Sequence, residues 1–595
     1  MSREQPLEGA PVAPLPPAPI LDPLPTVNPG IAYRPADFST VAEALDYAAK
    51  GITGCQFYDS RGQLAYVLPY ATLRDDAVRI ARKLINAGVE PGARIAILAA
   101  TDPDFLRVFF ACQYAGLFAV PLPVPSSLGG RNDHIGHLRR LLISSGAVGA
   151  VGPDVFAEDL HTAAAGLDLL FCGGPDVLER FSDRDCTLRP LAPDADSHIQ
   201  YSSGSTRMPA GVIISQKALM ANASSIAAHG LQINAEDRCV SWLPYYHDMG
   251  LIGFVLVPLM CQRSVDYLAP DSFARRPLEW LKLISRNGGT LSFSPSFGYE
   301  ICVRRAGRQT ESIDLSSWRV AGIGGEMVQA QKMQDFVETF SQFGFRADAF
   351  VPSYGLAEAT LAVSFARLEG GIVTDCVDRE SLSRGQDAIP AGTSNEDSAK
   401  RFVKCGHPMP GYEVSIRDDC GAILADRQIG TVFLRAPSLF NGYFADPEAT
   451  AQVLSADGWL NTGDRGYMID GELVITGRSK DLLIVNGRNI WPQDLEAAAE
   501  DLDDVRPRDS AAFAVSDADG KEHAVLLIQC RLSDEAARQR LRTAVQAAAR
   551  RRAAIDCEVV LIPPGSLPFT TSGKLSRSKA RQNYLSGTYT VAHAA

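Results

Sequence analysis

The chain has 595 residues, of which 46% are hydrophobic and 21% are charged, and its formal net charge is −12. This composition is typical of a soluble globular protein, and the length predicts about three to five compact units. The acidic balance disfavours a nucleic-acid-binding surface. Since the longest apolar runs are too short to cross a bilayer and the start of the chain has no signal-peptide pattern, we expect a cytoplasmic protein without stable membrane insertion.

The N-terminal part of the sequence alternates between helical and strand patterns. Residues 1–34 are rich in Pro and predict a flexible, extended tail. A helix is predicted over 72–88, with Thr72 and Asp75 as a capping-box-like start. A short apolar strand follows at 94–100 after a Pro-Gly turn.

The same alternation continues with a helix over 105–115 and a strand over 117–120 that Pro121 is expected to end. It recurs as a strand at 240–244, a helix at 272–286 and a strand at 290–294. Helices between strands imply βαβ units and a parallel sheet, and hence an α/β fold.

Near residue 400 the sequence pattern changes from alternating helices and strands to mainly strands. Strands separated by Gly and Asp turns predict a β-rich subdomain over about 400–479, and the remainder, 480–595, shows a compact α+β pattern. That final segment includes a long Ala/Arg-rich helix near 535–553. We therefore expect a large N-terminal domain over 35–479 and a small C-terminal domain after a boundary near Lys480.

The most informative motif is a loop of small residues that begins after Tyr201 and ends at Gly211. Hydroxyl groups and glycine backbone amides suit a polyphosphate, although no Walker pattern is present. A Ser- and Gly-rich surface loop would explain the stretch equally if it stood alone. The residues expected to contact phosphate are Ser202, Ser203, Gly204, Ser205 and Thr206.

Further motifs follow in a fixed order along the chain. They are Leu243–Gly250, Gly324–Glu326, Tyr354–Glu358, Thr462–Asp464, Gly477–Arg478 and Pro568–Lys574. Taken together, they resemble the adenylate-forming superfamily, which contains acyl-CoA synthetases, luciferases and peptide-synthetase adenylation domains. The resemblance covers about residues 35–585. It implies a large domain of two αβαβα subdomains plus the β-rich subdomain, and a small, mobile α+β domain.

Within that superfamily the sequence is most similar to the fatty acyl-AMP ligases. Three features carry this resemblance: Arg207 in the phosphate loop, a long insertion within about 359–402, and the segment 480–496. Ala210 departs from the pattern, because a Lys usually ends this loop. We interpret Arg207 as a substitute for the missing positive charge.

The resemblance implies ATP and Mg²⁺ as cofactors and assigns roles to individual residues. Glu358 would hold Mg²⁺, Asp464 and Arg478 would bind the ribose, and Lys480 would be the hinge, although a solvated loop lysine is the alternative for Lys480. Lys574 would bridge the acyl carboxylate and the α-phosphate. Tyr354 would stack on adenine, with Gly324 and Glu326 lining the base pocket, and Gly325, Ser353 and Gly355 would also belong to the ATP- and AMP-binding site.

The acyl pocket is less clearly marked in the sequence. His247 is the candidate nearest to the reacting carboxylate, and core packing would explain most of the other candidates as well. The candidates are Tyr245, His247, Met249, Gly250, Phe254, Phe293, Ser294 and Tyr299. No acidic residue stands where amino-acid-activating relatives bind the substrate ammonium, which favours a fatty acid.

The implied reaction converts a fatty acid into its acyl-adenylate and then transfers the acyl group to the phosphopantetheine thiol of a separate acyl carrier protein. The arginine-rich helix near 535–553 could meet such an acidic partner, and a solvated basic face explains the same pattern equally. Two other interpretations stay open. One is an acyl-CoA synthetase with a long loop, and the other is a catalytically inactive nucleotide- or lipid-binding regulator.

Overall fold

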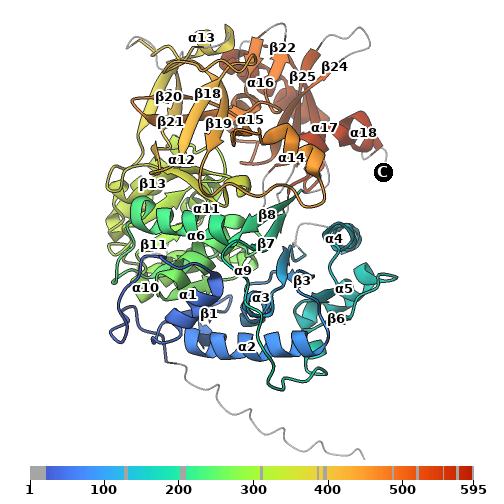
Figure 1. The fold of residues 1–595 in the computed structure, drawn as a ribbon. Helices are drawn as coiled ribbons and strands as arrows, with labels where there is room; N and C mark the ends of the chain where they lie inside the picture. The colour runs from blue at the N-terminus through green and yellow to red at the C-terminus, as the bar shows by residue number, and fades with distance from the viewer. Residues whose placement is uncertain are drawn as a thin grey trace, which may run out of the picture.

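The architecture is an assembly of two large α/β sheets, a β-rich subdomain and a small α+β domain (Figure 1). The computed structural model describes residues 22–591 except for 126–130, 202–209, 308–312, 385–386, 393–398, 486–487, 517–521, 554 and 571–574. Among the described residues, none of the helices combines the length and the apolar character needed to cross a membrane. The predicted fold class is confirmed.

The largest sheet has nine strands and forms the centre of the molecule. Its six inner strands, from β13 to β1, are parallel, and its edge strands are antiparallel. In spatial order the strands are β17 (His407–Pro408), β14 (Ala362–Phe365), β13 (Phe350–Gly355), β12 (Val320–Ile323), β11 (Leu291–Phe293), β9 (Cys239–Ser241), β10 (Val265–Leu268), β1 (Gly54–Tyr58) and β2 (Leu64–Pro69).

The second sheet has six strands, of which five are parallel and the last is antiparallel. In order they are β6 (Phe171–Gly173), β5 (Gly149–Val151), β3 (Arg94–Leu98), β4 (Phe118–Leu122), β7 (Asp196–Tyr201) and β8 (Gly211–Ser215). Contrary to expectation, Pro121 does not end β4. Pro121 pairs with Ile97 of β3. On the other side of β4, the pairing with β7 is limited to Ala119, so the N–H that Pro121 lacks is not needed for a hydrogen bond to β7.

The helices of the large domain agree with the alternating pattern, because all of them except the first lie between consecutive strands of the chain. They are α1 (Val41–Ala48), α2 (Tyr70–Asn86), α3 (Pro103–Ala115), α4 (Arg131–Ser145), α5 (Ala157–Ala164), α6 (Gln216–Ser225), α7 (Asp248–Leu251), α8 (Val257–Met260), α9 (Pro270–Arg275), α10 (Leu278–Asn287), α11 (Ser296–Arg305), α12 (Ala330–Phe340) and α14 (Pro447–Val453). Two short π-helical segments, η3 (Ile226–Gly230) and η4 (Ile252–Leu256), interrupt this regular pattern.

Two helix predictions need correction. Helix α2 begins at Tyr70, with Pro69 as its N-cap and no side-chain capping bond, so the predicted start at Thr72 is wrong. The buried Tyr70 donates its hydroxyl to the Arg263 carbonyl (2.8 Å), and this tertiary contact fixes the first turn. The helix predicted over 272–286 is two helices, α9 and α10, because Pro277 breaks the pattern.

The β-rich subdomain is a four-stranded antiparallel sheet of β18 (Glu413–Arg417), β19 (Gly430–Arg435), β20 (Leu460–Ile469) and β21 (Glu472–Arg478). The hairpin β15 (Thr374–Asp378) and β16 (Ala399–Val403), with helix α13 (Arg379–Arg384), falls within the predicted insertion. Its buried residues, among them Val377 and Phe402, share a core with Tyr467 of β20, so the hairpin packs on this sheet.

In the part of the small domain that the structure describes, there are two further sheets and four helices. These are β22 (Leu483–Val485) with β23 (Arg488–Ile490), then β24 (Ser510–Ser516), β25 (Glu522–Gln529) and β26 (Cys557–Ile562), and helices α15 (Pro492–Glu500), α16 (Glu535–Ala553), α17 (Arg577–Leu585) and α18 (Thr588–Val591). Two hydrophobic clusters consist only of residues from Leu483 onward, so this part has cores of its own. The segment between β21 and β22 contains Lys480, and the hinge assignment there remains a prediction.

Candidate active site

A large cavity lies where the parallel strands of the two large sheets end. It has a volume of about 1290 Å³ and is lined by residues that follow β4, β7, β9, β12 and β13, together with residues of the β-rich subdomain. Ligands of open α/β sheets bind outside the carboxyl ends of the strands, so this location is the expected one. We call the part of its lining that contains Tyr354, Glu358 and Arg478 the nucleotide branch, and the part that contains Met249, Phe254 and Phe293 the acyl branch.

Asp464 of β20 lies directly behind the wall of the nucleotide branch: it is almost fully buried and is not among the residues that line the cavity, whereas its neighbours Gly463 and Arg465 are. Tyr354 of β13 donates its hydroxyl to one carboxylate oxygen (Oδ2, 2.7 Å), and Arg478 Nε lies 3.2 Å from the other (Oδ1). Asp464 and Arg478 are also paired in register across β20 and β21, so the sheet itself brings the acid and the base together. The carboxylate raises the pKa of Arg478, while burial and the same carboxylate raise the pKa of Tyr354.

A second carboxylate, that of Glu358, is partly buried and lines this branch. Its Oε1 accepts a hydrogen bond from the Tyr443 hydroxyl (2.7 Å), and its backbone carbonyl accepts from the Phe440 amide (2.9 Å). Burial raises the pKa of Glu358, whereas the bond from Tyr443 opposes that shift by stabilising the charged form. Tyr443 was not predicted from the sequence; an aromatic residue directly after the Asn441-Gly442 turn is the only local signal for it.

The remaining nucleotide-site predictions fall into two groups. Gly324, Gly325, Ser353 and Gly355 line the cavity, whereas Glu326 is exposed and is not among its lining residues. A Cβ on Gly324 would lie 2.7 Å from Ser353 Oγ, so the absence of a side chain there allows the close approach. Lys480 lines the cavity as well. Ser202 to Thr206, Arg207 and Lys574 lie outside the described residues.

His247 also lines the cavity and is the N-cap of the short helix α7. Its Nδ1 lies 2.6 Å from the carboxylate of Asp248, and this contact orients the imidazole at the cavity wall. Gly250 does not line the cavity. A Cβ at this position would come within 2.1 Å of the Pro244 carbonyl oxygen, so Gly250 permits the tight turn that presents His247.

The acyl branch contains three of the predicted residues, Met249, Phe254 and Phe293. Tyr245, Ser294 and Tyr299 are fully buried and are not among the lining residues. Tyr299, for example, donates its hydroxyl to the Gly322 carbonyl (2.9 Å) within an aromatic core. The branch also has apolar lining residues that the sequence did not indicate: Ile226, Leu231, Gly253, Leu361, Ala362 and Phe365.

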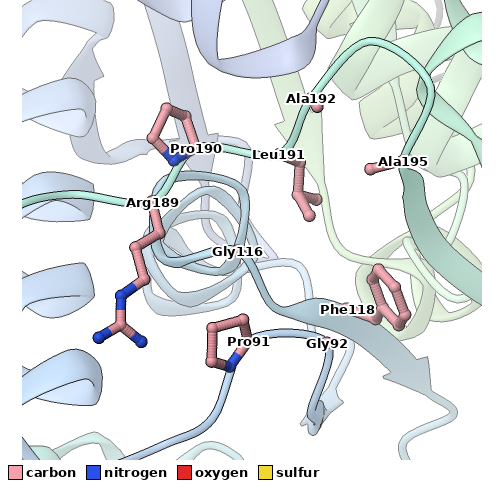
Figure 2. Close-up of a pocket in the computed structure, with 9 residues that line it drawn as sticks. All are labelled: Pro91, Gly92, Gly116, Phe118, Arg189, Pro190, Leu191, Ala192 and Ala195. Carbon is pink, nitrogen blue, oxygen red and sulfur yellow. The ribbon is translucent and has the colours of Figure 1, made fainter.

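A second, shallower hollow lies near the amino-terminal ends of β3 and β4 in the six-stranded sheet, next to the segment 189–195 (Figure 2). It has a volume of about 400 Å³ and contains one charged side chain, Arg189, among prolines, glycines and alanines. Since polar groups do not converge there, the hollow has none of the features of a catalytic site.

Comparisons with known proteins identify the family. A profile described as AMP-binding enzyme matches residues 63–444, which is more than half of the chain. This chain belongs to the AMP-binding enzyme family. A putative acyl-CoA synthetase from Caulobacter vibrioides is 48% identical, with 93% of this chain and 97% of that protein covered.

Other relatives of this AMP-binding enzyme are described as ligases or adenylate ligases of fatty acids. The medium-chain-fatty-acid–[acyl-carrier-protein] ligase JamA from Moorena producens is 31% identical over 93% of this chain and 96% of that protein. A solved structure from a study of fatty acyl-adenylate ligases of E. coli and L. pneumophila is 42% identical, with a TM-score of 0.89, and covers 94% of this chain and 100% of that one. The predicted resemblance to fatty acyl-AMP ligases is therefore confirmed.

The site residues of this AMP-binding enzyme fit a magnesium–nucleotide complex. Mg²⁺ in such enzymes is held by one or two carboxylates together with substrate phosphates, and not by an all-protein cage. Within the described part of the chain, no cluster of three or more His, Cys, Asp or Glu side chains could hold a metal ion. Glu358, with one oxygen held by Tyr443, is a carboxylate of the required kind.

Proposed function

We propose that the protein uses ATP to activate a fatty acid as its acyl-adenylate and then transfers the acyl group to the phosphopantetheine thiol of a separate acyl carrier protein. The observation that carries this proposal is the lining of one cavity. Glu358 and Tyr354, whose hydroxyl donates to Asp464, line the same cavity as His247 and the apolar residues Met249, Phe254 and Phe293.

The first step joins two anions. A carboxylate oxygen of the acid attacks the α-phosphorus of ATP, and the bond from that phosphorus to pyrophosphate breaks. Mg²⁺, held by Glu358, would neutralise phosphate oxygens, and Asp464 would accept hydrogen bonds from the ribose hydroxyls. Lys574 would bring a positive charge to the acyl carboxylate and the α-phosphate. Such charges are worth more in a partly dry site than in water, since Coulomb energies rise as the effective dielectric constant falls.

The second step breaks the mixed anhydride. The thiol sulfur attacks the acyl carbon, a thioester forms, and AMP leaves with the electron pair of the broken C–O bond. Transfer to a carrier protein is supported by the name of the relative JamA, a fatty-acid–carrier-protein ligase. Helix α16 supplies the basic residues expected to meet an acidic carrier, and Arg551 and Arg552 at its end are exposed.

The second candidate function is that of an acyl-CoA synthetase. The 48% identical relative carries that description, and the first half-reaction is the same. The two candidates differ only in the thiol acceptor. In the insertion hairpin, Lys400 Nζ lies 2.7 Å from Asp494 of the small domain, and this ion pair is one contact that would restrain movement of the small domain between the two half-reactions.

The deciding experiment incubates the purified chain with ATP, Mg²⁺ and a panel of labelled fatty acids, and offers either CoA or a phosphopantetheinylated carrier protein as acceptor. We expect fatty-acid-dependent ATP–pyrophosphate exchange and acyl transfer to the carrier protein. Efficient acyl-CoA formation would favour the synthetase. The absence of exchange with every acid would favour the inactive nucleotide- or lipid-binding regulator.

A further inference from the structure

Both π-helical segments found among the described residues contribute to the lining of the acyl branch. Segment η3 provides Ile226 and, directly after its end, Leu231, while η4 provides Gly253 and Phe254. A π-turn spaces its hydrogen bonds by five residues and widens the backbone locally, and such turns occur frequently at functional sites. Here the amide of Leu231 donates to the carbonyl of Ile226 (2.8 Å), which closes the η3 turn.

Segment η3 is in close contact with the opposite wall of the branch. A Cβ on Gly230 would lie 2.5 Å from the ring of Phe365, so the backbone of η3 packs directly against that ring. Phe365 is in turn 6.5 Å from Phe293, centroid to centroid, and Phe293 is 5.9 Å from Phe254. The end of η3 and the rings of Phe365, Phe293 and Phe254 therefore form one continuous apolar wall.

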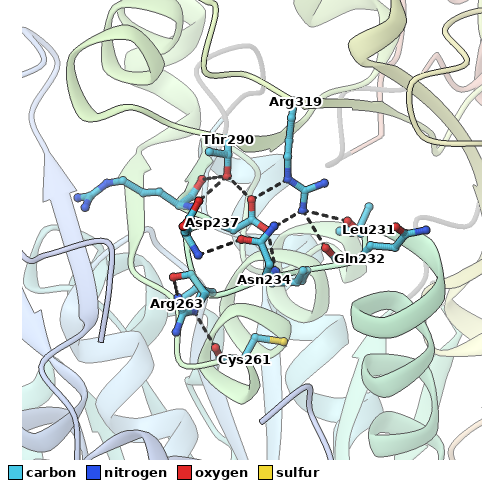
Figure 3. Close-up of polar contacts among 12 residues, drawn as sticks. Leu231, Gln232, Asn234, Asp237, Cys261, Arg263, Thr290 and Arg319 are labelled. Atoms are coloured by element: carbon cyan, nitrogen blue, oxygen red, sulfur yellow. Dashed lines mark hydrogen bonds and ion pairs between the residues drawn. The ribbon is translucent and has the colours of Figure 1, made fainter. Parts of the chain in front are cut away.

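The end of η3 is held by a polar network on its other side (Figure 3). Arg319 Nη2 donates to the carbonyls of Leu231 (3.0 Å) and Gln232 (3.1 Å). The same guanidinium binds Asp237 through Nε (2.8 Å) and Nη2 (2.5 Å). Gln232 has a φ of +46°, so the chain leaves η3 in a conformation that few L-residues adopt without such support.

The network is anchored at the ends of strands. Asp237 and Arg319 come just before β9 and β12, and Thr290, whose hydroxyl donates to Asp237 (2.7 Å), comes just before β11. These strands are neighbours in the parallel sheet, so the network lies at the edge opposite to the one where His247 and Gly324 emerge. Asp237 is 1% exposed, and its carboxylate also accepts from the Asn234 amide (2.9 Å).

We infer that Leu231 is the floor of the acyl branch and that Arg319 and Asp237 are positioning residues that fix this floor and so set the longest acyl chain that the site accepts. The inference rests on the proposed function and adds a determinant of chain length to it. The guanidinium contacts the backbone of Leu231 from outside the cavity, and the Leu231 side chain lines the cavity on the inside.

The test measures kcat/KM for a series of saturated acids from hexanoate to octadecanoate by pyrophosphate release, together with the KM for ATP. Leu231→Ala deepens the branch, so the preferred acid becomes longer, with a gain of about fourfold for each extra methylene buried. Leu231→Phe has the opposite effect. Leu219→Ala is the matched control, because Leu219 is fully buried in the neighbouring helix α6 but does not line the cavity.

Arg319→Gln and Asp237→Asn test the positioning role. We expect the ratio of long-chain to medium-chain kcat/KM to rise several-fold in both, with an unchanged KM for ATP, and Arg319→Lys to restore part of the wild-type ratio. In the double variant Leu231→Ala/Arg319→Gln the two shifts should not add, since both act on the same floor. Equal losses with all acids would show a purely structural role and overturn the inference.

The failure of this inference and the failure of the proposed function give different results. If the wild-type chain shows no exchange with any fatty acid, the proposed function is wrong and the inference is overturned with it. If the wild-type chain is active but Leu231→Ala keeps the wild-type chain-length profile, only the floor assignment is wrong. Melting curves of each variant separate a loss of folding from a change of preference.

Discussion

The nucleotide branch and the acyl branch of the cavity are built in different ways. At the nucleotide branch, two carboxylates accept hydrogen bonds from tyrosines: the buried Asp464 from Tyr354, and the partly buried Glu358 from Tyr443. In the acyl branch, the described walls are apolar side chains presented by strand ends and by the π-helical segments η3 and η4. One branch selects by charge and hydrogen bonding, and the other selects by shape.

This difference determines what a substitution can do. Removal of a charged group in the nucleotide branch leaves a buried partner without its counterpart, which costs far more than the loss of contact area alone. Removal of a methylene in the acyl branch costs about 0.8 kcal/mol and changes the preferred substrate more than the rate. The predictions below test this contrast, from the largest expected effect to the smallest.

Lys574→Ala should have the largest effect. The proposed role requires its ammonium at the acyl carboxylate and the α-phosphate, so we expect a loss of adenylate formation of about three orders of magnitude. Transfer of the acyl group from chemically prepared acyl-adenylate to the thiol should persist, and the two half-reactions are measured separately. Lys579→Ala, an exposed lysine in α17, is the control. An equal loss of both steps would contradict the role of Lys574.

Asp464→Asn should lower kcat/KM for ATP by about one to two orders of magnitude, because the neutral amide cannot replace a carboxylate that binds Arg478 and accepts from Tyr354. The KM for the fatty acid should stay unchanged. Asp470→Asn makes the same chemical change in an exposed turn next to β20 and should have no effect. If both substrates lost affinity equally, the two branches would not be independent.

The sequence predicts the nucleotide branch better than the acyl branch for a physical reason. Gly324 and Glu358 belong to short motifs that follow β12 and β13, and the carboxyl ends of parallel strands meet at one edge of a sheet. Their place in the cavity therefore follows from the order of elements. Tyr443 could not be found in this way, since its contact with Glu358 joins residues 85 positions apart.

The acyl branch depends on features that a sequence pattern does not encode. An extra backbone residue in a π-turn leaves no periodic signal, so Ile226, Leu231 and Gly253 were missed. Tyr245 and Tyr299 were predicted to line the pocket, but their side chains are packed in aromatic clusters in the core. The direction of these two side chains is decided by packing against aromatic rings that are distant in the sequence.

Phe293→Leu should affect only the acyl branch. The ring is 5% exposed, and a Cβ on Gly322 would lie 2.1 Å from it, so the backbone of β12 packs directly on this side chain. We expect the KM for the fatty acid to rise by about one order of magnitude through lost apolar contact, with the KM for ATP unchanged. Phe345→Leu, a buried phenylalanine away from the cavity, is the control for lost stability. A matching rise in the KM for ATP would show that the branches are coupled.

Tyr443→Phe should have the smallest effect, because it removes one hydroxyl and keeps the ring. Glu358 would lose the bond that favours its charged form. Since both residues are only partly buried, the net contribution of this hydrogen bond is about 1 kcal/mol, so we expect the KM for Mg²⁺–ATP to rise about fivefold. Tyr584→Phe is a matched control, since Tyr584 donates to Glu558 (2.9 Å) on an exposed surface of the small domain. Comparable changes in the two variants would show that the effect comes from general destabilisation. A change confined to Tyr443→Phe would show that a single neutral donor in the nucleotide branch affects ATP binding through the charge of Glu358. Binding of the fatty acid in the acyl branch depends instead on side-chain volume.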